Sequence, residues 1–179
     1  MKILKTRLKS KINIRTEQDF PVKGVEFIDI NPLIFDKDTF KEIINKFAKE
    51  VKKKKADYIL CPEARGFLFG TAAGYKANVP CIPIRKKGKL PPSTVLKDIS
   101  YEKEYGLDHM ELPSLYNDDY KGKNFYIIDD IYATGNTIRA ICEVVESLGG
   151  KIAGIGVVIN IKELNKDKKI YSLIDINEG

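Results

Sequence analysis

The residues FYIIDDIYATGNT at positions 125–137 constrain the fold more than any other part of the sequence. Phe125 to Ile128 predict a buried strand, and Asp129 and Asp130 close it. A loop of small and hydroxyl-bearing residues follows and leads directly into a segment whose apolar positions recur at helical spacing. A strand that passes through a polar loop into a helix is typical of α/β proteins, in which ligands bind at the carboxyl ends of the strands.

Short apolar runs alternate with helical patterns along the rest of the chain. Strands are predicted at residues 58–61, 79–85, 125–128, 152–159 and 171–174, and helices at 40–51, 67–76 and 138–148. Asp38 is a plausible N-cap of the first of these helices. The strands are almost continuously apolar, which predicts a parallel sheet covered by helices on both faces.

Two segments lack a regular pattern. Residues 1–35 are the least regular part of the chain, and residues 86–122 form a long polar stretch. A long segment of that kind inside a compact domain is usually functional or mobile. We therefore expect one domain over residues 1–179, with a mobile loop region at 86–122.

Composition excludes several classes of protein. The chain is 43% hydrophobic and 31% charged, with no apolar run long enough to span a membrane and no signal peptide, so we expect a cytoplasmic protein. Its three cysteines form no CxxC pair, which favours buried free thiols, and a single histidine excludes a histidine-rich metal site. The net charge of +6 comes largely from lysines without interleaved aromatic residues, so we predict no nucleic-acid partner.

The loop after the aspartates has the composition of an anion site. Small residues let backbone N–H groups approach an anion, hydroxyl groups add donors, and a helix N-terminus adds positive potential. Asp129 and Asp130 suit the hydroxyl groups of a polyol, or a nearby cation. Together they predict a ribose 5-phosphate site, although Asp130 capping a turn and Thr137 capping the helix remain the alternative. The phosphate-loop residues are Ala133, Thr134, Gly135, Asn136 and Thr137.

This string resembles the phosphoribosyl-pyrophosphate signature of type I phosphoribosyltransferases. Further segments resemble the adenine phosphoribosyltransferase family: DFP at 19–21 with GVEF at 24–27, EARGFLFG at 63–70, RKKGKLP at 85–91 and EYG at 104–106. The resemblance implies a central parallel sheet flanked by helices, a small base-binding hood in residues 1–35 and a catalytic loop within residues 86–122.

The resemblance also implies a reaction. Adenine and 5-phosphoribosyl 1-pyrophosphate would give AMP and pyrophosphate in purine salvage, with Mg²⁺ as cofactor and a homodimer as the assembly. The magnesium ion would be held mainly by the pyrophosphate, near Asp129 and Asp130, without a set of direct protein ligands.

The family's site residues transfer to matching positions of this chain. Arg65, with Arg85, Lys86 and Lys89, would bind pyrophosphate, and Glu26, Phe27 and Ile28 would bind the base. Glu104 would handle the proton of the attacking base, Tyr105 would help to close the loop, and Arg65 would support catalysis.

Two other functions remain open on the sequence. Ile28 stands where the family usually has arginine, and Glu26 where valine or leucine is common, so a 6-oxopurine could replace adenine as substrate. A non-catalytic regulator that senses a ribose phosphate is the second alternative, but about 20 residues before the core are too few for a winged helix. Asn136 stands where the phosphate loop usually has glycine, and asparagine tolerates left-handed backbone better than other residues.

Overall fold

The computed structural model describes residues 1–20, 22–103, 106–116, 118–165 and 170–177. Eight strands form one sheet in the order β1-β10-β9-β8-β4-β5-β7-β6, and β2 and β3 form a separate ribbon. The helices are α1 (Asn31–Phe35), α2 (Lys37–Lys53), α3 (Arg65–Ala77) and α4 (Asn136–Ser147), with a 3₁₀ turn at Pro92–Thr94. The strands are β1 (Lys2–Thr6), β2 (Arg15–Gln18), β3 (Glu26–Asp29), β4 (Tyr58–Pro62), β5 (Cys81–Lys86), β6 (Val95–Lys103), β7 (Gly106–Pro113), β8 (Asn124–Tyr132), β9 (Lys151–Ile161) and β10 (Tyr171–Asn177).

The five strands predicted from the sequence form the parallel centre of the sheet. β10, β9, β8, β4 and β5 pair in parallel, whereas β1 at one edge and β7 and β6 at the other pair antiparallel. The predicted α/β fold is therefore confirmed, with a mixed sheet in place of a wholly parallel one. The central strand β8 shows why the predicted strands are continuously apolar. Both faces of the sheet are covered there, and Phe125 to Ile128 are each at most 1% exposed.

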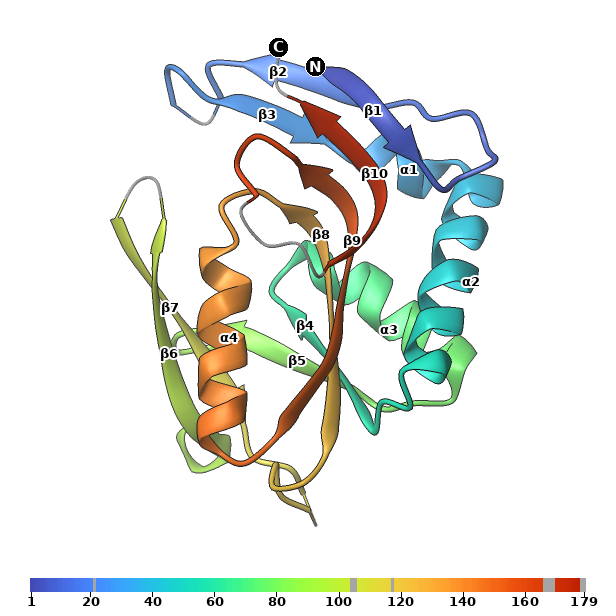
Figure 1. Cartoon of the computed structure of the whole chain (residues 1–179). Coiled ribbons are helices and arrows are strands. Elements are labelled where there is room, and N and C mark those ends of the chain that lie inside the picture. The colour runs from blue at the N-terminus through green and yellow to red at the C-terminus, as the bar shows by residue number, and fades with distance from the viewer. Residues whose placement is uncertain (21, 104–105, 117, 166–169, 178–179) are drawn as a thin grey trace.

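Helices cover the two faces unequally (Figure 1). α2 and α3 pack on one face, and α4 packs on the other beside the β6–β7 hairpin (Figure 1). The predicted apolar side of α2 is buried, but the helix begins earlier than predicted. Asp36, not Asp38, is the N-cap, because its Oδ1 accepts a hydrogen bond from the backbone N–H of Thr39 at 2.8 Å.

The polar stretch at 86–122 contains ordered strands where the sequence predicted a loop. β6 and β7 pair along their length as an antiparallel hairpin, and β7 also pairs with β5. Ile99, Tyr101, Met110 and Leu112 are all at most 5% exposed. This period-two pattern was missed because polar residues interrupt it: Ser100 lies between Ile99 and Tyr101, and the buried Glu111 lies between Met110 and Leu112.

Small residues let α3 lie close to the sheet. A Cβ atom added to Gly70 would lie only 2.7 Å from Cys61 Cβ, and one added to Gly74 only 2.7 Å from the carbonyl oxygen of Val79. The helix can therefore rest directly on β4 and the start of β5, with Arg65 at its first position. All three cysteines are free as predicted, although only Cys61 is fully buried.

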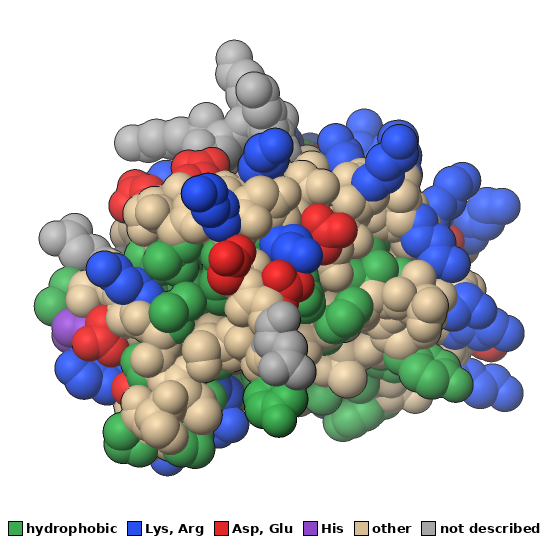
Figure 2. Space-filling model, turned by 90° about the horizontal axis from the view of Figure 1, so that it is seen from below, with side chains coloured by type: hydrophobic (Ala, Val, Ile, Leu, Met, Phe, Trp, Pro, Cys, Tyr) green, Lys and Arg blue, Asp and Glu red, His purple; other side chains and the backbone are tan. Residues whose placement is uncertain are grey.

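Positive charge is distributed unevenly over the surface. Lysine and arginine side chains crowd one side of the molecule in the view from below, with acidic side chains among those nearer its centre (Figure 2). Lys52 to Lys55, at the end of α2 and just after it, are all exposed. Among the described residues, no helix is long and apolar enough to cross a membrane.

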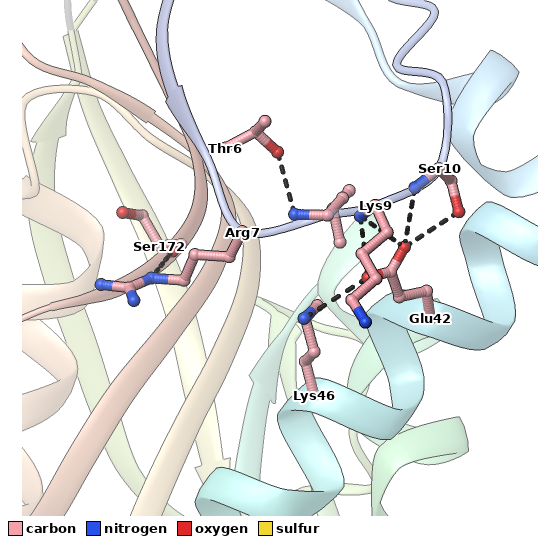
Figure 3. A network of polar contacts seen from close by, with 8 residues as sticks. Thr6, Arg7, Lys9, Ser10, Glu42, Lys46 and Ser172 are labelled. Carbon is pink, nitrogen blue, oxygen red and sulfur yellow. Dashed lines mark hydrogen bonds and ion pairs between the residues drawn. The ribbon is translucent and has the colours of Figure 1, made fainter.

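Glu42 attaches the segment after β1 to α2 (Figure 3). Its carboxylate accepts hydrogen bonds from the backbone N–H groups of Lys9 and Ser10 and from Ser10 Oγ, at 2.9–3.0 Å, and pairs with Lys46 Nζ at 3.4 Å. Arg7 fixes the same segment to β10, because its Nε donates to the carbonyl oxygen of Ser172 at 2.9 Å (Figure 3).

These contacts make the stability depend on pH. Burial alone would raise the pKa of Glu42, but the hydrogen bonds from Lys9 and Ser10 outweigh it and lower the pKa to about 2. Because the folded pKa lies below the unfolded value of about 4.5, the stabilisation is complete above pH 4.5. It is lost as the pH falls from there through about 2.

We therefore predict that Glu42→Gln lowers the free energy of unfolding at pH 7 by about 1–3 kcal/mol, because an ionised acceptor of several hydrogen bonds is lost. The difference from the wild type should shrink steadily between pH 4.5 and 2. Urea denaturation at pH 7 and pH 3 measures both effects. Glu146→Gln, an exposed substitution on α4, is the matched control, and an equal loss in both variants would contradict the assignment.

Candidate active site

A cavity of about 350 Å³ lies at the carboxyl edge of the sheet. The turn after β4, the end of β8, the β3 segment and the β6–β7 hairpin contribute its walls. The β2–β3 ribbon lies across the end of the sheet at which β9 and β10 finish (Figure 1). The lining residues are Val25, Glu26, Phe27, Ile28, Pro62, Glu63, Ala64, Arg65, Tyr101, Met110, Asp129, Asp130, Ile131, Ala133, Thr137, Ile161 and Leu164.

Arg65 connects three parts of this cavity. Its Nε lies 2.7 Å from Asp130 Oδ2, and its guanidinium carbon lies 5.5 Å from the centre of the Phe27 ring. Its Nη1 also donates a long hydrogen bond of 3.5 Å to the carbonyl oxygen of Ile28. The side chain is 40% exposed, so the cation is held by the protein and still open to a ligand.

Asp129 and Asp130 are the sixth and seventh of the nine residues of β8, which continues to Tyr132 instead of ending at Ile128. Asp130 is 6% exposed, and its backbone N–H donates to Asp129 Oδ1 at 2.8 Å. Burial, and then the neighbouring Asp130 charge, raise the pKa of Asp129 above its ordinary value, whereas Arg65 acts in the opposite direction. Arg65 therefore stabilises both carboxylates, Asp130 by direct contact and Asp129 by its charge.

Gly66 allows the start of α3 to come this close to β8. A Cβ atom there would lie 3.1 Å from Asp129 Oδ1, from the Ile128 carbonyl oxygen and from Pro62 Cδ. A side chain at this position would push the helix, and Arg65 with it, away from the carboxylates.

The predicted phosphate loop forms a second, smaller cavity of about 110 Å³. Gly135 has a φ of +81° and is the N-cap of α4, and within the described chain no side chain caps this helix. Thr137 therefore does not cap α4, contrary to that alternative, and a helix N-terminus without a side-chain cap is a common anion site. We name this cavity the phosphate cradle; its lining residues are Asp129, Ile131, Tyr132, Ala133, Thr134, Gly135, Asn136, Thr137 and Ile138.

The two cavities adjoin. Asp129, Ile131, Ala133 and Thr137 line both of them. The carboxylate pair and the phosphate cradle are therefore neighbours in space as well as in sequence. Such an arrangement suits a ligand that carries both hydroxyl groups and a phosphate.

The residues predicted to bind pyrophosphate divide into two groups. Arg65 lines the main cavity, but Arg85, Lys86 and Lys89 are not among its lining residues. Arg85 Nε and the backbone N–H of Lys86 instead each donate to Glu63 Oε2 at 2.9 Å. These bonds lower the pKa of Glu63 although partial burial acts in the opposite direction, and the bond from Lys86 has the largest effect. They also fix the turn that precedes Arg65.

All three residues predicted to bind the base line the cavity. Phe27 contacts Arg65 on one side and packs edge-on against Phe20, with ring centres 5.1 Å apart. Ile28 is 4% exposed and belongs to the hydrophobic core, so little of its side chain faces the cavity. Glu26 is half-buried on the same strand.

Glu104 and Tyr105 lie outside the described residues. Sequence reasoning missed Tyr101, Met110, Ile161 and Leu164, which also line the cavity. The alternating apolar positions of the β6–β7 hairpin could have indicated the first two. The last two come from the end of β9 and the turn after it, and no local pattern marks them as site residues.

Comparison with known proteins agrees with this geometry. The family model described as a phosphoribosyl transferase domain matches residues 34–179. The adenine phosphoribosyltransferase of Clostridium acetobutylicum is 43% identical over 159 residues, which cover 88% of this chain and 90% of that protein.

Solved structures agree as well. The crystal structure of adenine phosphoribosyltransferase from Thermoanaerobacter pseudethanolicus has a TM-score of 0.82 and 39% identity, and the match covers 91% of this chain and 95% of that one. The Saccharomyces cerevisiae enzyme, crystallised with D-2,5-dideoxy-2,5-imino-altritol 1,6-bisphosphate and adenine, has a TM-score of 0.78 and 32% identity, with coverage of 89% and 93%. The chain therefore belongs to the phosphoribosyltransferase family and, within it, to the adenine phosphoribosyltransferases.

Proposed function

We propose that the main cavity binds adenine and the ribosyl pyrophosphate group, and that the phosphate cradle binds the 5′-phosphate of the same substrate. The adjoining cavities support this proposal most directly, because they share Asp129 and Thr137. As a member of its family, the chain forms AMP and pyrophosphate from adenine and 5-phosphoribosyl 1-pyrophosphate in purine salvage, as the sequence predicted.

The chemistry of the step explains the charges at the site. A bond forms between a ring nitrogen of the base and the anomeric carbon, while the bond from that carbon to pyrophosphate breaks. The sugar gains positive charge as the leaving group takes the electron pair, so the site must hold both charges in place. Asp129 and Asp130 accept from the ribose hydroxyl groups, and Arg65, 2.7 Å from Asp130, faces the leaving pyrophosphate.

The hood supplies the base site in this proposal. Phe27 offers an aromatic face for the purine ring, and Arg65 lies 5.5 Å from the centre of that face. Adenine against Phe27 would lie beside Arg65 and near Asp129 and Asp130, because all four side chains line the same cavity. Arg85 acts on pyrophosphate only indirectly here, because its Nε binds Glu63 and fixes the turn before Arg65. Lys86 and Lys89 keep the pyrophosphate role that the family resemblance implies.

Mg²⁺ fits the donor set as a substrate-bound ion. No group of three or more metal-ligating side chains occurs in the described part of the chain, and Asp130 is already paired with Arg65. Magnesium keeps most of its waters and binds substrate phosphates, so the pyrophosphate would supply its main protein-independent ligands and the ion would lie near Asp129 and Asp130. When bound, it would neutralise charge on the pyrophosphate.

We also propose a homodimer, as the family resemblance implies. Leu68 and Tyr75 support it, because they lie seven residues apart on one side of α3 and are 48% and 92% exposed. Sedimentation equilibrium measures the mass in solution. A cytoplasmic location stays a prediction from the sequence.

The base preference is the first test of the proposed function. With phosphoribosyl pyrophosphate and Mg²⁺, adenine should give AMP, and hypoxanthine or guanine should react with a kcat/KM lower by about 10²–10⁴-fold, because a site built for a 6-amino group leaves polar groups unpaired against a 6-oxo group. Product formation with each base, followed by chromatography, measures this. Preference for a 6-oxopurine would contradict the assignment of adenine as the base. Absence of turnover with every base tested would contradict the enzymatic function.

Arg65→Lys should lower kcat/KM by about 10²–10³-fold, because lysine cannot keep both the contact with Asp130 and a directed donor toward pyrophosphate. Steady-state kinetics with varied phosphoribosyl pyrophosphate measures the loss. Arg15→Lys is the matched control, since Arg15 forms an ion pair with Asp29 at 2.9 Å outside the main cavity. Equal activity of the two variants would show that Arg65 has no role in transfer.

Glu104 and Tyr105 keep the roles that the family resemblance implies. Glu104→Gln should lower kcat much more than it weakens phosphoribosyl pyrophosphate binding, because the amide cannot take the proton of the attacking base. Comparing kcat with the dissociation constant from calorimetry separates the two effects. Unchanged turnover would remove this carboxylate from the mechanism.

A further inference from the structure

Two side chains support the phosphate loop at its left-handed residue, Gly135. Tyr132, at the end of β8, is 2% exposed. A Cβ atom added to Gly135 would collide with Tyr132 Oη and would lie 2.8 Å from Arg139 Nη1. The guanidinium of Arg139, one helical turn into α4, is therefore packed against the loop together with the tyrosine ring.

The same arginine holds a neighbouring side chain of the loop. Arg139 Nη2 donates a hydrogen bond of 2.6 Å to Asn136 Oδ1. Asn136 is the first residue of α4 and lines the phosphate cradle, and its backbone N–H is one of the donors at the helix N-terminus.

Asn136 adds an acceptor to a cavity that must bind an anion. Its Oδ1 carries partial negative charge, and a carbonyl oxygen turned toward a phosphate dianion would repel it. A glycine at this position would have no such atom. The same amide also carries an NH2 group that can donate to a phosphate, so its orientation matters. The bond from Arg139 engages Oδ1 and thereby opposes the orientation in which that oxygen faces the anion.

We infer that Arg139 is a positioning residue for the known reaction: it engages Asn136 Oδ1 and keeps that oxygen from turning toward the 5′-phosphate, so that the cradle presents donors to the anion. The inference rests on the proposed function of the cradle. It assigns Asn136 and Arg139 as a pair, in which the arginine is needed because the asparagine is present.

A double-mutant cycle tests this pairing. Arg139→Gln should raise the dissociation constant of ribose 5-phosphate and the KM for phosphoribosyl pyrophosphate by about tenfold, or about 1.4 kcal/mol, because a charged donor then no longer holds Asn136 Oδ1. The KM for adenine should change less than about twofold, since the base lies in the other cavity. In the Asn136→Gly background, the same Arg139→Gln change should alter ribose 5-phosphate binding by less than about twofold.

Isothermal titration calorimetry with ribose 5-phosphate and steady-state kinetics give these values. Arg15→Gln is the control for loss of an arginine from an ion pair outside both cavities, and urea denaturation checks that each variant is folded. If Arg139→Gln does not fold, Arg139→Lys replaces it, with a smaller increase expected because one donor remains.

The outcomes separate two failures. Equal losses from Arg139→Gln in the asparagine and glycine backgrounds would overturn the inference and show that the arginine acts on the phosphate by its charge. No loss in either background would overturn it as well. If the wild type itself does not bind ribose 5-phosphate, the proposed function of the cradle fails instead.

Discussion

The ion pair between Arg65 and Asp130 is the interaction on which the site depends. It joins the turn after β4 to the end of β8, and the same guanidinium contacts Phe27 and the Ile28 carbonyl oxygen of the hood. A buried carboxylate beside a second one is unfavourable without a cation, so the arginine makes the Asp129–Asp130 pair possible. Since Arg65 stays partly exposed, it can also bind a negatively charged substrate.

The sheet makes that ion pair possible. β4 and β8 are parallel neighbours, so the segments that follow them emerge at the same edge. Close packing then sets the distance between them, because Gly66 and Gly70 leave no side chain between α3 and the strands. The glycines of this helix are thus part of the site, although they have no chemistry of their own.

The phosphate cradle shows how a departure from a family pattern can be accommodated. Gly135 provides the left-handed turn that begins α4, and Tyr132 and Arg139 fill the space beside it. Asn136 adds a polar side chain to the loop, and a nearby cation binds that side chain. In the proposed function, the cradle would combine backbone donors with a contact from Arg139, which lies outside the recognised string.

The sequence by itself determined the five parallel strands, the passage from strand through loop into helix over residues 125–137, and the family, because each depends on local periodicity or on contiguous residues. Only the tertiary structure decided that Arg65 pairs with Asp130, that Arg85 is occupied by Glu63, and that Tyr101 and Leu164 line the cavity. These contacts join residues far apart in the chain, and no local pattern specifies which charged side chains will meet. The β6–β7 hairpin was missed for a related reason: polar residues, including the buried Glu111, interrupt its apolar pattern. Its pairing with β5 is what reveals it as part of the sheet.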